Sequence, residues 1–173
     1  MIFISKNTFC GLFLVLLLAI NTMTIFSELK RELSLMATII YCIHDFVRPP
    51  YMMIDMQIHH WLTLILCSHA FVNEKLPWDF IKIMLKTEVS TVFLVLKNYN
   101  IKNLVVKIGF LVTFFYYRIF KLFELLFFTC LEHDEIKPHA IAYYCSLGLY
   151  GMNIYWAFKI LYILNKRKKD FVK

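Results

Sequence analysis

The side chains best suited to acid–base chemistry stand in the middle third of the chain, inside otherwise apolar segments. Asp55, His59 and Thr63 are spaced at i, i+4 and i+8, so a helix would place them on one stripe. Asp55 could then accept a hydrogen bond from one ring nitrogen of His59, fix its tautomer and leave the other nitrogen free. A histidine held in this way suits a general base or a nucleophile. The same residues would also serve as a polar seam between packed helices, and their spacing leaves both interpretations open.

Three more residues extend this set of candidates. His60 follows His59 directly and therefore points about 100° away from it on the helix. Glu88 has no cation on its own helix face, so we expect its partner to be His59, His60 or Arg118 on another helix. The alternative is a hydrated Glu88 near the membrane interface. Arg118 stands inside an apolar block, so we expect it to face a cavity and pair with an acid or with an anionic group of a ligand.

Signatures of known cofactor sites do not occur in the sequence. The six His residues do not follow the HxxxH and HxxHH spacings of membrane di-iron hydroxylases. There is also no P-loop, no nucleophile elbow and no dinucleotide-binding fingerprint. We therefore expect neither a metal nor a bound cofactor.

The elements that carry these residues are predicted to be transmembrane helices. The chain of 173 residues is 60% hydrophobic and 18% charged, whereas soluble domains are about 45–50% apolar and about 25% charged. Its apolar residues form long blocks, and a bilayer core requires about 20 of them per helix. The first block lacks a small-residue cleavage site, which disfavours a signal peptide. The sequence predicts an all-α, multi-pass transmembrane bundle of about six helices, with spans at 8–26, 33–48, 53–73, 79–98, 104–130 and 139–164.

The distribution of Lys and Arg predicts the orientation of this bundle. An even number of spans would put both termini on one side, together with the second and fourth connections. That side carries nine Lys and Arg residues and the other carries four, so the positive-inside rule favours two cytosolic termini. We interpret the basic tail, 166–173, as a segment at the lipid headgroups rather than as a nucleic-acid site.

Five landmarks in consistent order resemble the TLC-domain family over roughly residues 31–165. They are His44-Asp45, Asp55-x-x-x-His59-His60-x-x-Thr63, Glu88-Val-Ser90-Thr91-Val-Phe93-Leu94, Tyr117-Arg118-Ile119 and Asn153-Ile-Tyr155-Trp156. The resemblance divides the chain into a first helix at 1–30, which matches least, a TLC-domain core at 31–165 and the basic tail.

The resemblance implies a membrane protein of the endoplasmic reticulum whose helices surround a lipid cavity. The family includes the ceramide synthases, which join a fatty acyl group from acyl-CoA to a sphingoid-base amine with a paired His and downstream acidic residues. His59 and His60 match that pair, and Glu88 stands where the first of the later Asp residues would be. Thr91 replaces the second Asp, and Thr87 replaces a preceding His. The sequence is therefore similar to the divergent members of the family.

Two functional hypotheses follow. The first is a protein of sphingolipid or phospholipid homeostasis that binds lipid in an intramembrane cavity without catalysis. The alternative is an acyl-CoA-dependent sphingoid-base N-acyltransferase, with acyl-CoA as co-substrate. We expect membrane lipids rather than nucleic acid as partners, and a homodimer is a further possibility. In the alternative hypothesis the catalytic residues are His59, His60, Asp55 and Glu88, and the lipid or substrate contacts are Arg118, Thr63 and Thr91.

Overall fold

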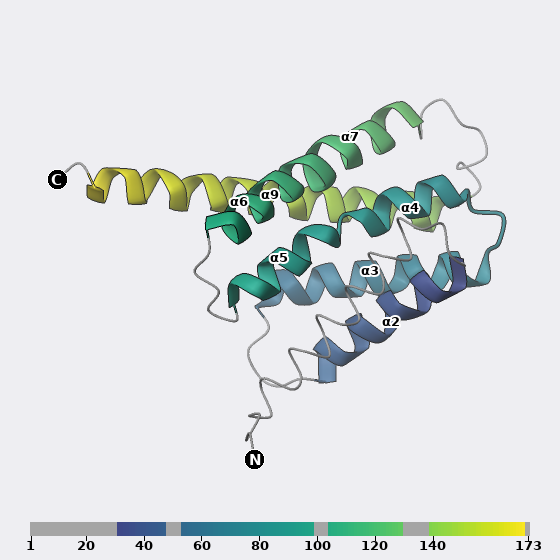
Figure 1. Cartoon of the computed structure of the whole chain (residues 1–173). Coiled ribbons are helices and arrows are strands. Elements are labelled where there is room, and N and C mark those ends of the chain that lie inside the picture. Colours follow the sequence, from purple (N-terminus) through teal and green to yellow (C-terminus); the bar gives the residue numbers. More distant parts are fainter. Residues whose placement is uncertain (1–30, 48–52, 99–103, 130–138, 172–173) are drawn as a thin grey trace, which may run out of the picture.

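The computed structural model describes residues 31–47, 53–98, 104–129 and 139–171 (Figure 1). Every regular element within these ranges is a helix, which confirms the predicted all-α class. The predicted first span, 8–26, lies outside the described residues, so the total of six spans stays a prediction. The helices are α2 (Arg31–Val47), α3 (Ile54–Val72), α4 (Trp78–Lys86), α5 (Val89–Asn98), α6 (Leu104–Thr113), η1 (Phe114–Lys121), α7 (Leu122–Glu124), η2 (Leu125–Thr129) and α9 (Ala140–Phe171).

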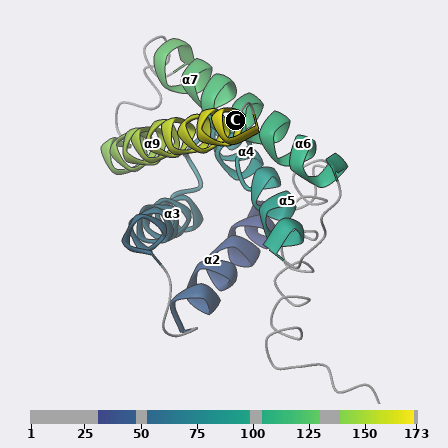
Figure 2. The same cartoon turned by 90° about the vertical axis from the view of Figure 1, so that its left-hand side faces the viewer.

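The helices run alternately up and down the bundle. α3 and α9 are antiparallel, because Asp55 near the start of α3 contacts Trp156 in the second half of α9, and His69 near the end of α3 faces His139 just before α9. The starts of α3 and α6 and the ends of α5 and α9 therefore lie at one end of the bundle, on the left in Figure 1. Figure 2 shows α2, α3, α5, α6 and α9 around a common centre. This alternation is the one that the predicted order of spans requires.

The predicted span 79–98 is divided in the structure by a tight turn at Thr87 and Glu88. The amide of Thr87 donates to the Met84 carbonyl at 3.2 Å, and the amide of Glu88 donates to the Leu85 carbonyl at 3.0 Å. These are bonds to the third residue back, which tighten the helix locally. The Thr87 hydroxyl also donates to the Met84 carbonyl, at 2.7 Å. The turn ends α4, begins α5 and presents the Glu88 side chain to the interior.

The predicted span 104–130 is a continuous helical run with two π-helical parts, η1 and η2. A π-helix has more residues per turn than an α-helix, so it changes the face on which later side chains lie, and such segments are frequent at functional sites. Arg118 stands within η1 and is buried. Among the described helices, one stretch is long and apolar enough to cross a membrane by itself, Ala140–Lys166 of α9.

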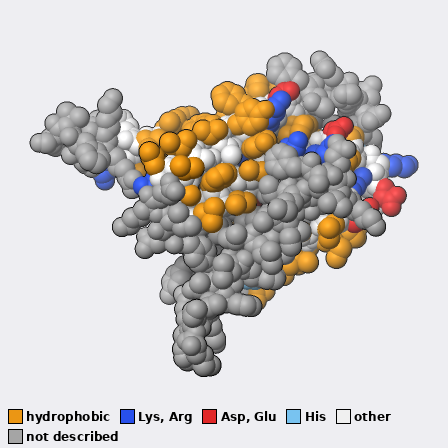
Figure 3. Space-filling view, in the orientation of Figure 1, with side chains coloured by type: hydrophobic (Ala, Val, Ile, Leu, Met, Phe, Trp, Pro, Cys, Tyr) orange, Lys and Arg blue, Asp and Glu red, His pale blue; other side chains and the backbone are white. Residues whose placement is uncertain are grey.

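The bundle is apolar outside, and its interior contains both an apolar core and a group of buried polar side chains. Phe158 and Tyr162 on α9 are 69% and 70% exposed, and large apolar side chains cover much of the surface in Figure 3. Soluble proteins rarely expose contiguous apolar surface on this scale, whereas a lipid-facing exterior requires it. An apolar core remains where α3, α4, α7 and α9 meet, around Phe80 and Leu122. The buried polar side chains are Ser34, Thr38, His59, His60, Thr63, Thr87, Glu88, Ser90, Thr91, Arg118, Ser146 and Asn153.

Arg31 joins the start of α2 to the end of α3. Its Nη2 donates to the carbonyls of Ala70 and Asn73 at 2.7 and 2.8 Å, and its Nη1 donates to those of Glu74 and Leu76 at 2.8 and 3.1 Å. The last carbonyls of a helix have no partner within the helix. A single guanidinium therefore satisfies four carbonyls and fixes the connection from α3 to α4.

We expect Arg31→Ala to destabilise the purified protein in detergent by about 2 kcal/mol or more, because hydrogen bonds to a charged group contribute about 1.5–3 kcal/mol each. Arg31→Lys should recover little of the loss, since an ammonium lacks the planar fork of donors. Thermal unfolding followed by circular dichroism measures the effect, with exposed Lys75→Ala in the same connection as control. Equal stability of R31A and K75A would show that the four bonds do not hold the fold.

Candidate functional site

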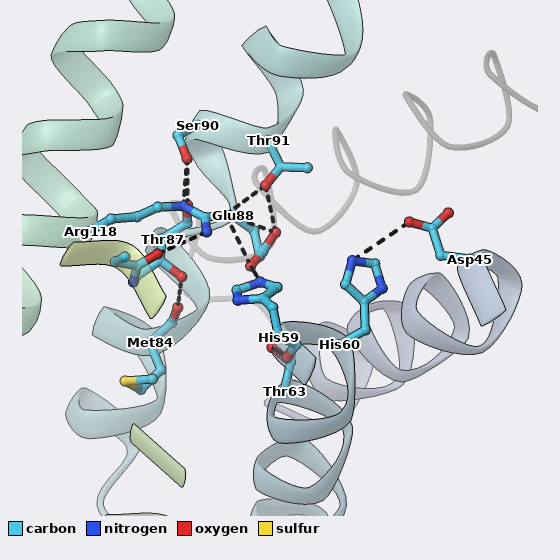
Figure 4. Close-up of polar contacts among 11 residues, drawn as sticks. Asp45, His59, His60, Thr63, Met84, Thr87, Glu88, Ser90, Thr91 and Arg118 are labelled. Carbon is cyan, nitrogen blue, oxygen red and sulfur yellow. Dashed lines mark hydrogen bonds and ion pairs between the residues drawn. The ribbon is translucent and has the colours of Figure 1, made fainter. Parts of the chain in front are cut away.

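Arg118 is the centre of a buried polar cluster that joins η1, α5 and α9 (Figure 4). Its Nε donates to the Thr87 carbonyl at 3.0 Å and to the Ser90 hydroxyl at 2.7 Å. Its Nη1 donates to Oδ1 of Asn153 at 3.2 Å, and its Nη2 donates to the Thr91 hydroxyl at 2.7 Å. The guanidinium is only 4% exposed, so these bonds replace the water it has lost.

Glu88 supplies the negative charge of this cluster. Its Oε1 lies 3.4 Å from Nη2 of Arg118 and 3.4 Å from Nε2 of His59, while its Oε2 accepts a 2.7 Å hydrogen bond from the Thr91 hydroxyl. The expected partners of Glu88 on other helices are therefore confirmed for His59 and Arg118. The alternative of a hydrated carboxylate at the interface is wrong, because Glu88 is only 5% exposed.

His59 has one ring nitrogen near Glu88 and another with unused hydrogen-bonding capacity. Its Nδ1 is buried and has no hydrogen-bond partner among the described residues. Thr63, one turn further on, donates its hydroxyl to the His59 carbonyl at 2.9 Å. Thr63 thus supports the backbone beneath His59 and is not among the residues that line the cavity described below. The contact of Thr63 with a ligand stays a prediction.

His60 points from α3 toward α2, as the helical geometry predicts (Figure 4). Its ring packs against those of Tyr41 and Phe46, with centroids 5.2 and 6.0 Å away. Its Nε2 lies 3.6 Å from Oδ2 of Asp45, which is beyond hydrogen-bond distance. Within the described part of the chain, neither ring nitrogen of His60 forms a hydrogen bond.

Asp55 does not bond to His59, and the predicted pair is wrong. Its Oδ1 accepts from the backbone amide of Met56 at 3.0 Å, and its Oδ2 accepts from Nε1 of Trp156 at 2.9 Å. Nζ of Lys159 lies 3.6 Å from the same Oδ2. The two residues share a helix stripe, but Asp55 meets α9 while His59 meets the turn at Glu88.

A cavity of about 340 Å³ lies beside the cluster, between α2, α3, α5, α6, η1 and α9. Five of the predicted site residues line it, namely Asp55, His59, His60, Thr91 and Arg118, while Glu88 and Thr63 stand outside its lining. Trp156 also lines the cavity and was not among the predicted site residues, although it ends the last of the five landmark motifs. The remaining lining residues are Tyr41, Met53, Met56, Ser90, Leu94, Phe110, Phe114, Trp156, Lys159, Ile160 and Ile163.

Trp156 connects the two polar parts of the cavity wall. Its ring centroid lies 5.1 Å from that of His59, and the guanidinium carbon of Arg118 lies 5.7 Å from its ring. Its indole nitrogen donates to Asp55. In the described ranges no three His, Cys, Asp or Glu side chains come together as a metal site would require. Among the described wall residues, His59 and His60 have ring nitrogens with unused hydrogen-bonding capacity.

A family model described as TLC domain matches residues 34–162, which is most of the chain and runs from α2 into α9. The chain belongs to the TLC-domain family. It is therefore a membrane protein with a lipid-related role, and the cavity lies inside its TLC domain. No curated protein and no solved structure matches the chain significantly.

Removal of one charge from the buried pair should destabilise the TLC domain strongly. We expect Glu88→Gln to lower the unfolding free energy by about 3 kcal/mol or more, because it leaves the Arg118 guanidinium buried without a counterion. The double variant E88Q/R118M should recover part of this loss. Glu124→Gln is the matched control, since it removes an exposed carboxylate whose partner, Lys121, also lies at the surface. Thermal unfolding in detergent that is equal for E88Q and E124Q would contradict a paired buried charge.

Proposed function

We propose that this TLC-domain protein binds one lipid in the cavity and holds its polar group by hydrogen bonds from His59 and His60. The observation that carries the proposal is the set of buried ring nitrogens that form no hydrogen bond within the described residues: Nδ1 of His59 and both nitrogens of His60, of which Nε2 lies 3.6 Å from the Asp45 carboxylate. An unsatisfied buried polar atom costs about 1–3 kcal/mol. Such atoms on two adjacent residues at a cavity wall are explained if a ligand completes their hydrogen bonds.

The cavity supports an amphiphilic ligand. Its volume of about 340 Å³ is within the range of ligand sites. The imidazoles and Arg118 stand on one part of the wall, and Leu94, Phe110 and Ile163 supply apolar surface elsewhere. A hydrocarbon chain would contact the apolar part while a hydrogen-bonding group lies beside the histidines.

The charge balance supports a neutral polar group. The Arg118 charge is matched by Glu88, and its donors are directed to Thr87, Ser90, Thr91 and Asn153. A phosphate at this position would compete with the carboxylate that already holds the guanidinium. A hydroxyl or an amide, as found in sphingolipids, adds hydrogen bonds without added charge.

A second candidate function is transfer of an acyl group to a lipid amine, and the contact between His59 and Glu88 favours it. A carboxylate behind an imidazole orients the ring and stabilises its protonated form. His59 would take the proton of the amine as its nitrogen attacks the acyl thioester, and the CoA thiolate would leave. The amide bond forms as the thioester bond breaks. Arg118 would not be the site for the CoA phosphates, because Glu88 already neutralises it.

Lipid that co-purifies with the protein tests the binding proposal. We expect a neutral amphiphile in stoichiometric amount with wild type, reduced at least tenfold in His59→Ala/His60→Ala, because about 1.4 kcal/mol of lost hydrogen bonding corresponds to a factor of ten. His69→Gln is the matched control, because His69 lies on the same helix but outside the cavity lining. Mass spectrometry of mild-detergent extracts gives the amounts. An equal lipid content in wild type and the double variant would contradict the proposal.

The acyltransferase candidate has a separate readout. Cells that express wild type should contain more of an amide-linked lipid than cells that express His59→Ala/His60→Ala at matched levels, if the second candidate is correct. Glu88→Gln should then lower the amount of product further than it lowers the amount of folded protein. Unchanged amide lipids beside retained co-purifying lipid would support binding without catalysis.

We also propose that the protein lies in the endoplasmic reticulum membrane with both termini in the cytosol. The charge asymmetry between the two sets of connections supports this orientation. A glycosylation acceptor sequence appended after residue 173 should stay unmodified, and one inserted in the connection that contains Lys75 should be modified. The reverse pattern would show that both termini lie on the lumenal side.

A further inference from the structure

A second groove lies on the outside of the bundle, between α4 and η1. It has a volume of about 360 Å³, and its wall contains three lysines, Lys82, Lys86 and Lys121, together with Tyr116 and Tyr117. It is separate from the cavity, because the two share no lining residue. Figure 3 shows blue basic side chains, with red acidic ones beside them, where α4 and α7 lie in Figure 1.

The three lysines come from two helices, α4 and η1, and face the same groove. Asp79, Lys82, Ile83 and Lys86 stand at i, i+3, i+4 and i+7 on α4, so they share one face of that helix. η1 contributes Lys121 from its last turn. Asp79 is the single acidic residue in the wall. Three ammonium groups around one groove repel each other, so their convergence favours an anion between them.

The carboxylates near these lysines can be displaced. Lys82 pairs with Asp79 at 2.7 Å, and Lys121 pairs with Glu124 at 2.6 Å. The side chains of Asp79 and Glu124 are 87% and 57% exposed. Exposed ion pairs of this kind contribute little, so a ligand anion that contacts several lysines at once would replace them.

The predicted span 79–98 starts at the membrane surface, so the lysines of α4 are close enough to it to reach the lipid headgroups. A helix rises about 1.5 Å per residue, which places Lys82 and Lys86 about 6 and 12 Å from the first residue of α4. Lysines at this depth extend their ammonium groups toward the headgroups while their methylenes stay in the hydrocarbon layer. Tyrosine is also enriched at that level. We propose that this groove binds a phosphate group, supplied by the headgroup of an anionic phospholipid that lies against α4 and η1.

The bound phosphate would also stabilise the region that positions Arg118. Lys86 directly precedes Thr87, whose carbonyl accepts from Nε of Arg118. Lys121 and Arg118 stand on the same π-helix. One phosphate that bridges Lys86 and Lys121 therefore stabilises the packing of α4 against η1, and the lipid should raise the thermal stability of the whole domain.

The test uses the full-length protein in neutral detergent with added phosphatidylglycerol or phosphatidylcholine. Phosphatidylglycerol should raise the unfolding midpoint of wild type by several degrees and remain as one adduct in native mass spectra, whereas phosphatidylcholine should do neither. K82Q/K86Q/K121Q should lose at least tenfold in phosphatidylglycerol affinity. K107Q, which removes an exposed lysine of α6, is the matched control and should behave as wild type.

A variant that keeps the charges guards against simple misfolding. K82R/K86R/K121R should restore phosphatidylglycerol binding, because guanidinium groups also bind phosphate. A second arm replaces the lipid by inorganic phosphate or CoA at millimolar concentration. The same lysine-dependent stabilisation by these soluble compounds would support a phosphate site but assign a soluble source. Equal responses of wild type and K82Q/K86Q/K121Q to phosphatidylglycerol, phosphate and CoA would overturn the proposal.

Discussion

The burial of Arg118 is the constraint on which the rest of the site depends. A guanidinium in a membrane interior is costly unless a counterion and hydrogen-bond acceptors surround it. Glu88 supplies the charge, and the turn before α5 supplies acceptors in the Thr87 carbonyl and the Ser90 hydroxyl. Asn153 supplies another from α9. One residue thereby fixes the mutual positions of three helices, and the cavity forms beside the contact.

The substitutions relative to the ceramide synthase pattern have structural roles in this site. Thr91 stands where an acid is expected, and its hydroxyl bridges the two charges by donating to Glu88 and accepting from Arg118. Thr87 stands where a His is expected, and its hydroxyl and carbonyl help to form the turn and hold the guanidinium. An acid and an imidazole are absent from these positions, while the paired histidines remain at the cavity.

The two proposals assign different lipid groups to the cavity and to the groove between α4 and η1. The cavity presents imidazoles beside a neutralised ion pair, so it favours an uncharged polar group. The groove between α4 and η1 presents three lysines beside exposed carboxylates, so it favours a phosphate. Lys86 lines the groove, and Thr87, the next residue, accepts a hydrogen bond from Arg118 beside the cavity. The turn at Thr87 and Glu88 is thus the element common to both.

The sequence by itself determined the helical class, the approximate limits of the helices and the residues whose charges needed partners. Apolar blocks and isolated charges such as Glu88 and Arg118 are local signals, and a buried charge demands a partner wherever the chain brings one. The tertiary structure alone decided which partner. Periodicity placed Asp55 and His59 on one stripe, but the facing helices differ along α3, so Asp55 bonds to Trp156 and His59 contacts Glu88. The turn that divides α4 from α5 and the π-helix around Arg118 also escaped prediction, because hydropathy fixes the length of a span and not the hydrogen-bond pattern that packing selects within it.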